Sequence, residues 1–469
     1  MDLPNLMEAK KRTKDKVIKE LYKKNINAKN IGVGKTYFVK TYGCQMNEHD
    51  SENIKALLEE MGFCETDNYE NANLVILNTC SIRENAHNKA FGMLGRLKHI
   101  KDSNPELIVG LCGCMAQEEK VVNQLLKEKK LVNFVFGTHN IHRLCDLVYE
   151  NFITSDQVIE VYSKEGSIIE NMPVKRENKY KAFVNIIYGC DKFCTYCIVP
   201  FTRGKQRSRY PEDIINEVKE LVKEGYKEVT LLGQNVNAYG KDLDIDYTME
   251  NLLEDVSSTG IPRIRFITSH PWDFTDNMID VIAKHKNIMP YIHLPVQSGS
   301  NRILKLMGRR YTKEKYLELF NKIREKVPNS SVSTDIIVGF PNETEEDFNE
   351  TLDLVDKCKF DNAFSFIYSP REGTAAALLE DKIPLKEKEE RLYKLNERLN
   401  KYFLLSNKKM KDSIVDVLVE GRNEKDKLFG YTDTFKLINF DGDDSLIGSI
   451  IKVKVIDAKT WSLDGEIYE

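Results

Sequence analysis

The stretch that decides the fold is 182–197, which reads AFVNIIYGCDKFCTYC. Its first half is an apolar run typical of a buried strand. The run leads into three cysteines at CxxxCxxC spacing, Cys190, Cys194 and Cys197, here called the loop trio. Structural zinc normally takes four ligands, usually from two CxxC pairs, and no second pair lies nearby in the sequence. Three thiolates suit an iron–sulfur cubane with one open iron, because soft sulfur ligands match iron–sulfur chemistry. A structural or zinc-binding role is the alternative.

An open iron of this kind can chelate the amino and carboxylate groups of S-adenosylmethionine. An electron then passes from the cluster to the sulfonium and breaks a carbon–sulfur bond. Three polar residues are candidates for holding the rest of that molecule. They are Gln234 at the end of the second expected barrel strand, Gln297 after the fourth, and Asp335 beside the apolar run of the fifth. A simple turn at Gln234 and a helix cap near Gln297 are the alternatives.

Around the loop trio, apolar runs alternate with helical patterns, which predicts βα units. Six such steps are too few for a closed eight-stranded barrel, so we predict an open, partial (β/α)6 barrel in a domain spanning 176–405. The expected strands are 182–190, 228–235, 263–270, 291–296, 331–340 and 363–369, and the expected helices are 211–224, 249–257, 312–327, 345–358 and 386–410.

The region 35–155 alternates in the same way and predicts an N-terminal α/β domain on a parallel sheet. Its expected strands are 36–43, 74–80, 107–114 and 133–138, and its expected helices are 48–61, 83–101, 117–128 and 141–151.

The remaining segments have other patterns. Residues 1–34 carry nine basic and four acidic side chains with weak periodicity. We expect a basic extension, mobile or loosely helical, that is either solvated or in contact with nucleic acid. Residues 156–175 lose the alternation and are expected to be a linker. From 406 to 469, short β-like pieces between turn residues predict a small all-β barrel of a kind that often binds RNA.

A second group of cysteines follows three strands of the N-terminal domain. Cys44, Cys80 and Cys114, here called the strand-end trio, each fall at the carboxyl end of an expected strand. Because ligands of open α/β sheets gather at that edge, three thiolates distant in sequence can converge there on a second cluster. Each could instead be a buried small hydrophobe. Cys112, two residues before Cys114, is the alternative ligand.

Four cations lie just beyond the loop trio. Arg203, Lys205, Arg207 and Arg209 fall within seven residues, near aromatic side chains. This pattern beside a reactive centre predicts phosphate contacts and base stacking with RNA. A solvated charge run is the alternative.

The composition fits a soluble protein. The 469 residues are 41% hydrophobic and 30% charged, with a net charge of −4, so any basic surface must be local. No apolar run approaches the ~18–20 residues that span a bilayer, and the N-terminus lacks a secretory pattern. We expect a cytoplasmic protein. Ten cysteines in a reducing compartment more often bind metal than form disulfides.

The ordered set of motifs resembles the radical S-adenosylmethionine methylthiotransferase family. The matching segments cover nearly everything after residue 34: TYGCQMN, NTCSIREN, GCMAQ, GCDKFCTYCIVPFTRGKQRSR, LLGQNVNAYG, TSHPWD, HLPVQSGS, TDIIVGFPNET and FSFIYSPREGT. The resemblance implies a radical domain, a C-terminal TRAM barrel that grips tRNA, and two 4Fe-4S clusters. The loop trio would bind the radical cluster and the strand-end trio an auxiliary one.

The implied reaction uses two molecules of S-adenosylmethionine. One methylates a sulfur atom of the auxiliary cluster, and the other yields a 5′-deoxyadenosyl radical that removes hydrogen from carbon 2 of a modified adenine. That carbon then captures the methylthio group. The motifs favour N6-dimethylallyladenosine beside the anticodon of tRNA over threonylcarbamoyladenosine or a ribosomal-protein aspartate. The expected partners are this tRNA and an electron donor such as flavodoxin or ferredoxin, and the expected state is a monomer. A zinc-stabilised RNA-binding protein is the rival from another class.

Overall fold

The computed structural model describes residues 18–81, 84–127, 131–162 and 167–468. They form two compact units. Unit 1 holds the residues up to 177 together with 187–193 and 197–209, and unit 2 holds 178–186, 194–196 and 210–469. The α/β fold class with parallel sheets is confirmed in both. No helix in the described part of the chain has the length and apolar character of a membrane span.

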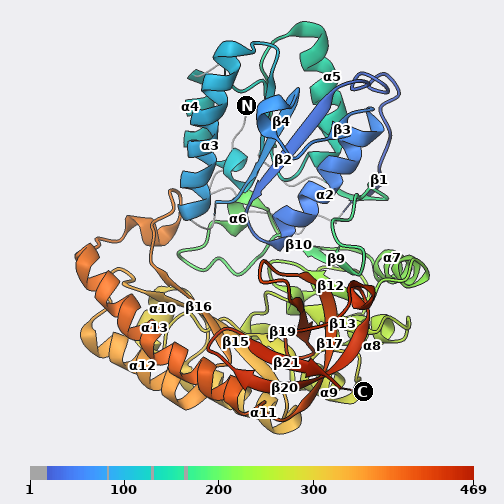
Figure 1. Cartoon of the computed structure of the whole chain (residues 1–469). Coiled ribbons are helices and arrows are strands. Elements are labelled where there is room, and N and C mark those ends of the chain that lie inside the picture. Colours follow the sequence, from blue (N-terminus) through green and yellow to red (C-terminus); the bar gives the residue numbers. More distant parts are fainter. Residues whose placement is uncertain (1–17, 82–83, 128–130, 163–166, 469) are drawn as a thin grey trace. The chain divides into compact units, whose positions relative to one another are not determined.

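Unit 1 is built on a six-stranded sheet in which every neighbouring pair is parallel (Figure 1). Apolar side chains fill both faces, as a sheet covered by helices on each side requires. In order across the sheet, the strands are β3 (Cys64–Glu65), β2 (Thr36–Tyr42), β4 (Leu74–Thr79), β5 (Ile108–Gly113), β6 (Phe134–Phe136) and β7 (Val158–Glu160).

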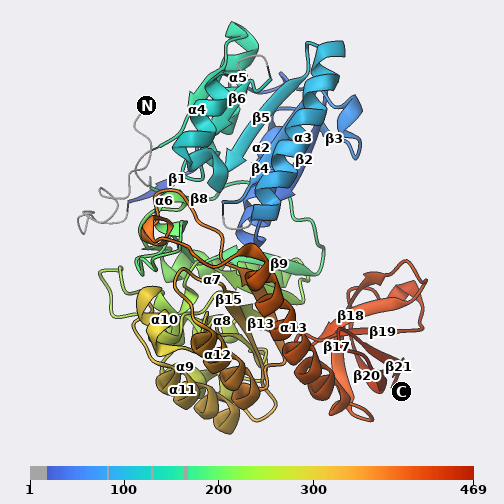
Figure 2. The same ribbon diagram turned by 90° about the vertical axis from the view of Figure 1, so that its left-hand side faces the viewer.

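The helices of unit 1 follow the βα alternation that the sequence predicted. One apolar cluster joins the sheet to α3 (Glu84–Ser103) and α4 (Glu119–Lys127). The other joins the opposite face to α2 (Gln45–Glu60) and α5 (Leu144–Thr154). The view in Figure 2 shows α3 and α4 lying along the sheet.

Two segments differ from the expectation. Residues 18–34 are not a loose helical arm, because β1 (Lys19–Leu21) pairs in parallel with β8 (Ile168–Glu170) and Ala28 is fully buried in a core cluster. The expected linker 156–175 contains both β7 and β8. Strands of three residues are too short to show a period of two, so the pattern could not reveal them. The rest of the expected arm, 1–17, lies outside the described residues.

Unit 2 contains the predicted partial barrel. Its six parallel strands form two three-stranded sheets joined by a bridge between Ile264 and Ile288. The strands are β9 (Lys181–Asn185), β12 (Glu228–Leu232), β13 (Arg263–Phe266), β14 (Tyr291–His293), β15 (Ser331–Val338) and β16 (Asn362–Ile367). The helices are α7 (Pro211–Lys223), α8 (Met249–Ser257), α9 (Asp276–Lys284), α10 (Asn301–Leu306), α11 (Lys313–Lys326), α12 (Glu345–Cys358) and α13 (Leu385–Lys408).

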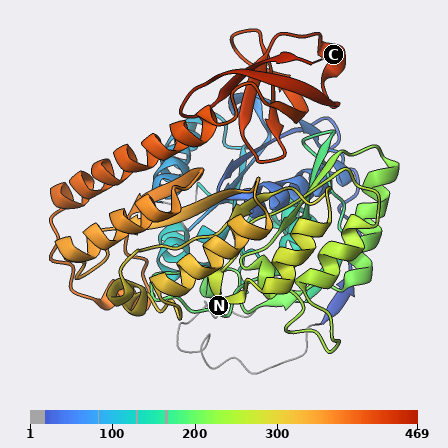
Figure 3. The ribbon, with the colours of Figure 1, turned by 90° about the horizontal axis from the view of Figure 1, so that it is seen from below.

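A small closed β-barrel completes unit 2, as predicted (Figure 3). It closes through β17 (Ile414–Arg422), β18 (Leu428–Thr432), β19 (Leu437–Phe440), β21 (Leu463–Ile467) and β20 (Ile450–Ala458). Arg265 fixes it to the partial barrel by donating to the carbonyls of Asp433 and Thr432 at 2.9 and 2.7 Å, while its Nε donates to Glu228 at 2.9 Å. Phe435, in the turn between β18 and β19, packs against Tyr291.

Candidate iron–sulfur centres

The sheet register brings the strand-end trio to one edge of unit 1. Tyr42 pairs with Thr79 across β2 and β4, and Thr79 pairs with Gly113 across β4 and β5. Cys80 and Cys114 are the next residues after their paired positions, and Cys44 follows Tyr42 by two. Three neighbouring strands therefore end level with one another, each carrying a thiol.

Local structure explains the residues around these thiols. Cys44 is the N-cap of α2, and the side chain of Asn47 in the first turn donates to Asn78 on β4 at 3.0 Å. Gly113 has φ 90°, and a Cβ there would lie 2.3 Å from the carbonyl of Thr79. Only glycine fits this close approach. The strand stops at Gly113, and Cys114 begins a short 3-10 helix.

A buried arginine faces the strand-end trio. The Arg203 guanidinium lies 2.7 Å from the Asp50 carboxylate, and the two side chains are only 4% and 6% exposed. Burial raises the pKa of the Cys114 thiol, while Arg203 acts in the opposite direction by its charge and a hydrogen bond. The charge of Arg203 also interacts with Cys44. The charge of one cation thus acts on two of the three thiols.

These residues fit an anionic iron–sulfur cluster. The Nε atom of Arg203 is a buried donor without an acceptor among the described residues, beside soft thiol ligands. The described residues contain no group of three histidine, cysteine or carboxylate side chains that could bind a single metal ion. The thiolates of a cubane bind three different irons, which is a wider arrangement than one ion needs.

Cys112 has a different position from the trio. It lies inside β5, paired with Asn78, and its side chain packs in the core cluster between the sheet and helices α2 and α5. Its carbonyl accepts from the Thr79 hydroxyl at 2.6 Å. Burial raises the pKa of its thiol. Cys112 thus lies within the strand and the core cluster, and Cys114 after the strand end stays the predicted third ligand.

The loop trio lies in a segment shared between the two units. Cys190 and Cys197 belong to unit 1, and Cys194 belongs to unit 2. In unit 1, β10 (Ile187–Tyr188) pairs with β11 (Arg207–Ser208), and the backbone N–H of Cys190 donates to the Gly204 carbonyl at 3.1 Å. Three thiols within eight residues remain the donor set expected of a radical-type cluster.

Two of the three candidates for S-adenosylmethionine binding are neighbours in unit 2. The backbone N–H of Gln297 donates to the Asp335 carbonyl at 2.8 Å, and Gln297 has φ 74°. Asp335 lies within β15, and its carboxylate is 3.5 Å from Nε2 of His293. Gln234 follows β12 and is half-buried. Their role as cofactor ligands stays a prediction.

The sequence did not reveal a polar chain along β14 and β15. His293 Nδ1 lies 2.9 Å from the Ser333 hydroxyl, which in turn donates to the Tyr291 hydroxyl at 2.9 Å. These side chains and Asp335 alternate along two adjacent parallel strands, so they share one face. That alternation was the signal available in the sequence.

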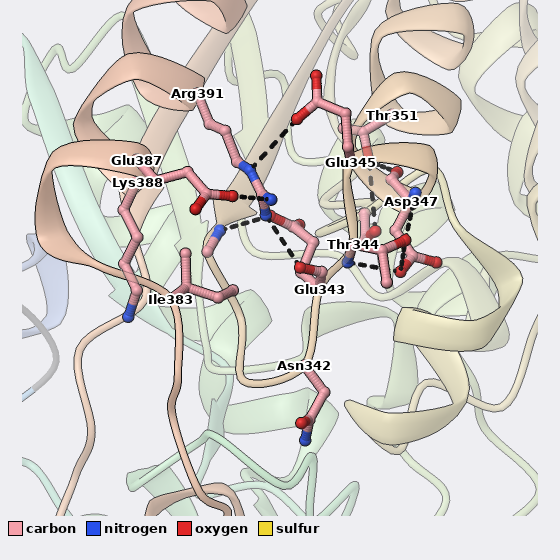
Figure 4. Close-up of polar contacts among 12 residues, drawn as sticks. Asn342, Glu343, Thr344, Glu345, Asp347, Thr351, Ile383, Glu387, Lys388 and Arg391 are labelled. Atoms are coloured by element: carbon pink, nitrogen blue, oxygen red, sulfur yellow. Dashed lines mark hydrogen bonds and ion pairs between the residues drawn. The ribbon is translucent and has the colours of Figure 1, made fainter.

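Figure 4 shows how the loop after β15 is held. The buried Glu343 carboxylate accepts from the Gly339 backbone N–H and from Arg391 of α13, both at 2.7 Å. Burial raises the pKa of Glu343, and the two donors oppose this. Thr344 caps α12 by accepting from the backbone N–H of Asp347. Arg391 could not be predicted, because it comes from a distant helix.

The cation run after the loop trio is mostly buried. Arg203 pairs with Asp50, and Arg209 pairs with Glu170 at 2.6 Å. The other two differ: Arg207 is buried with its guanidinium 5.7 Å from the Tyr188 ring centroid, and Lys205 is half-buried. The structure gives Arg203 and Arg209 carboxylate partners inside unit 1, so it does not support RNA contacts by these two. RNA binding by this run stays a prediction.

Three family models match the chain in separate segments. They are the uncharacterized protein family UPF0004 at residues 36–137, the radical SAM superfamily at 184–355 and the TRAM domain at 408–468. The tRNA-2-methylthio-N(6)-dimethylallyladenosine synthase of Bacillus subtilis strain 168 is 55% identical over 99% of this chain and 92% of its own length. The synthase of Staphylococcus epidermidis RP62A is 54% identical over 98% and 91%. The chain belongs to the tRNA-2-methylthio-N(6)-dimethylallyladenosine synthase family.

This membership confirms the resemblance drawn from the motifs. Among solved structures, the radical S-adenosylmethionine methyltransferase TsrM from Kitasatospora setae, with cobalamin and a [4Fe-4S] cluster bound, matches with a TM-score of 0.52. The match covers 73% of this chain and 74% of that one at 13% identity. It supports the fold of the synthase family and nothing finer.

Proposed function

We propose that this chain is a tRNA methylthiotransferase that converts N6-dimethylallyladenosine beside the anticodon to its 2-methylthio derivative. The observation that carries the proposal is the 55% identity to a synthase of that name over 99% of the chain. Family membership also brings the two cofactors that the motifs imply, 4Fe-4S clusters and S-adenosylmethionine.

Two cysteine trios would hold the two clusters. The loop trio would bind the radical cluster, and the strand-end trio the auxiliary one. When bound, the clusters supply the electron that cleaves S-adenosylmethionine to a 5′-deoxyadenosyl radical, and the methylthio group that replaces hydrogen at carbon 2. A C–H bond of this kind offers no acid or base a site for attack, so the cofactors must carry the chemistry.

The protein contributes charge and position. In unit 1, Arg203 would balance part of the negative charge of the auxiliary cluster, and Asp50 holds the guanidinium in place. In unit 2, Gln297 and its neighbour Asp335, which lies within β15, would hold S-adenosylmethionine. The small β-barrel would bind the tRNA, and Lys205 is the least buried cation of the basic run.

Analysis of tRNA nucleosides tests the substrate. A deletion strain should lack 2-methylthio-N6-dimethylallyladenosine and accumulate the unthiolated nucleoside, and the wild-type gene should restore the product. An unchanged product level in the deletion strain would eliminate this substrate. Loss of a thiolated threonylcarbamoyladenosine or of a protein modification instead would assign the same chemistry to another substrate.

The remaining partners belong to the same proposal. The chain would act as a cytoplasmic monomer that receives electrons from a flavodoxin or ferredoxin. Anaerobic purification separates this proposal from a zinc-stabilised RNA-binding protein. The enzyme would be brown and contain iron and acid-labile sulfide, whereas the zinc protein would be colourless and contain neither.

A further inference from the structure

Arg309 is a buried cation in unit 2 that lies against a cysteine of the loop trio. It follows α10 and is 6% exposed. Its three nitrogens have different partners. Nε donates to the Tyr311 hydroxyl at 2.9 Å, and one terminal nitrogen donates to the Pro295 carbonyl at 2.8 Å. The other terminal nitrogen donates to Sγ of Cys194 at 3.5 Å.

Among the residues that the structure describes, this guanidinium has no carboxylate partner. Its hydrogen-bond partners are a hydroxyl, a carbonyl and a thiol, and the described part of unit 2 places no acidic side chain within ion-pair distance of Arg309. Two other buried arginines of the unit have one: Arg391 pairs with Glu343 at 2.7 Å and Arg265 with Glu228 at 2.9 Å. An unpaired buried charge costs several kcal/mol. An anionic group bound at Cys194 would balance the charge of Arg309.

Both sides of this contact are fixed. The Tyr311 hydroxyl donates to the Val296 carbonyl at 2.9 Å, which holds the plane of the guanidinium. Next to Cys194, Thr195 donates from its backbone N–H to the Met307 carbonyl at 2.9 Å and from its hydroxyl to the Leu306 carbonyl at 2.8 Å. The cysteine and the arginine are thus anchored to the same end of α10. The N–H···S contact is built into the fold.

We infer that Arg309 is a positioning residue that sets the reduction potential of the radical cluster through its hydrogen bond to the Cys194 sulfur. The inference rests on the proposed function, in which Cys194 binds that cluster. Reduction adds negative charge to the cluster, and a cation hydrogen-bonded to its thiolate stabilises the reduced form more than the oxidised one. Removing the charge should lower the equilibrium constant for reduction about tenfold, which is about 59 mV for one electron.

The test measures the potential of the radical cluster alone. All variants are made in the full-length chain with the strand-end trio replaced by alanine and are reconstituted anaerobically. Arg309→Gln keeps a neutral donor, and Arg309→Lys keeps the charge. The control is Arg310→Gln, because the neighbouring Arg310 is exposed, with its guanidinium 5.8 Å from the Trp272 ring centroid. Redox titration followed by electron paramagnetic resonance gives the potential, and circular dichroism checks the fold.

The expected order is a potential about 59 mV lower for Arg309→Gln than for the parent, an intermediate value for Arg309→Lys, and no change for Arg310→Gln. Equal potentials for Arg309→Gln and Arg310→Gln would overturn the inference. If Arg309→Gln fails to load iron, Arg309→Lys decides by the same comparison. Failure of both to load would reject it in favour of a structural role. A parent protein that binds no iron would refute the proposed function instead.

Discussion

Breaking the Asp50–Arg203 pair tests whether unit 1 is built to hold an anion beside its strand-end trio. The two charged groups lie 2.7 Å apart with almost no exposure. Removing one partner of a buried pair costs about 3–5 kcal/mol, because the other charge stays buried. At about 2–4 °C per kcal/mol for a unit of this size, Asp50→Asn and Arg203→Met should each lower the melting temperature of the apoprotein by roughly 6–20 °C. The double variant should cost less than the sum of the two.

Cluster binding should change the loss of stability in opposite directions for the two single variants. An anionic cluster beside Arg203 can replace part of the missing Asp50 charge, so Asp50→Asn should cost less in the reconstituted protein than in the apoprotein. Arg203→Met should cost more, because the cluster loses its cation. Anaerobic calorimetry of both forms measures these differences. The control is Glu170→Gln, which breaks another buried pair of unit 1, with Arg209, on strand β8 outside the six-stranded sheet. Equal costs of each variant with and without the cluster would refute the reasoning.

Three further predictions follow from the two units. Cys80→Ala should still cleave S-adenosylmethionine but not insert sulfur, Cys194→Ala should do neither, and Cys112→Ala should do both. Chromatography measures 5′-deoxyadenosine and the thiolated nucleoside. Repeated turnover of thiolated nucleoside by Cys80→Ala would contradict the assignment. Arg265→Met removes three charge-assisted hydrogen bonds of about 1.5–3 kcal/mol each. The rate of amide hydrogen exchange in residues 428–440 should therefore rise at least about tenfold. Unchanged exchange rates would argue against Arg265 as an anchor. Burial lowers the pKa of Lys101 to about 8, against 10.5 in the unfolded chain. Because the unfolded state binds more protons between these values, the stability of the wild type should rise relative to that of Lys101→Met from pH 8 to 10.5. A difference in denaturant midpoints between the two proteins that does not change with pH would contradict this.

The sequence predicted the parts of the fold that have a strong local pattern. Apolar runs predicted the six barrel strands and the four central strands of unit 1. Parallel strands buried on both faces consist of nearly uninterrupted hydrophobic residues, so they are visible in the sequence. The level strand ends of the first domain followed from parallel topology, which put Cys44, Cys80 and Cys114 at one edge. Short strands such as β1 and β8 carry too few residues for a period and depend on a partner far along the chain.

The local sequence pattern could not predict which carboxylates pair with the buried arginines. Arg203 and Arg209 belong to a dense run of cations that suggests a solvated or RNA-binding surface. Each instead forms a buried ion pair, with Asp50 and Glu170, which are far away in sequence. Arg309 has no sequence signal that separates it from the exposed Arg310 next to it. Long-range ion pairs depend on tertiary packing, and charge density along the chain does not report it.

Iron and acid-labile sulfide analysis of two triple variants tests the central claim most directly. In one variant alanine replaces the strand-end trio, and in the other it replaces the loop trio. After anaerobic reconstitution, each variant should retain half of the wild-type iron and sulfide. S-adenosylmethionine should change the electron paramagnetic resonance spectrum only of the variant that keeps the loop trio. Full iron content in the variant without the strand-end trio would contradict the account.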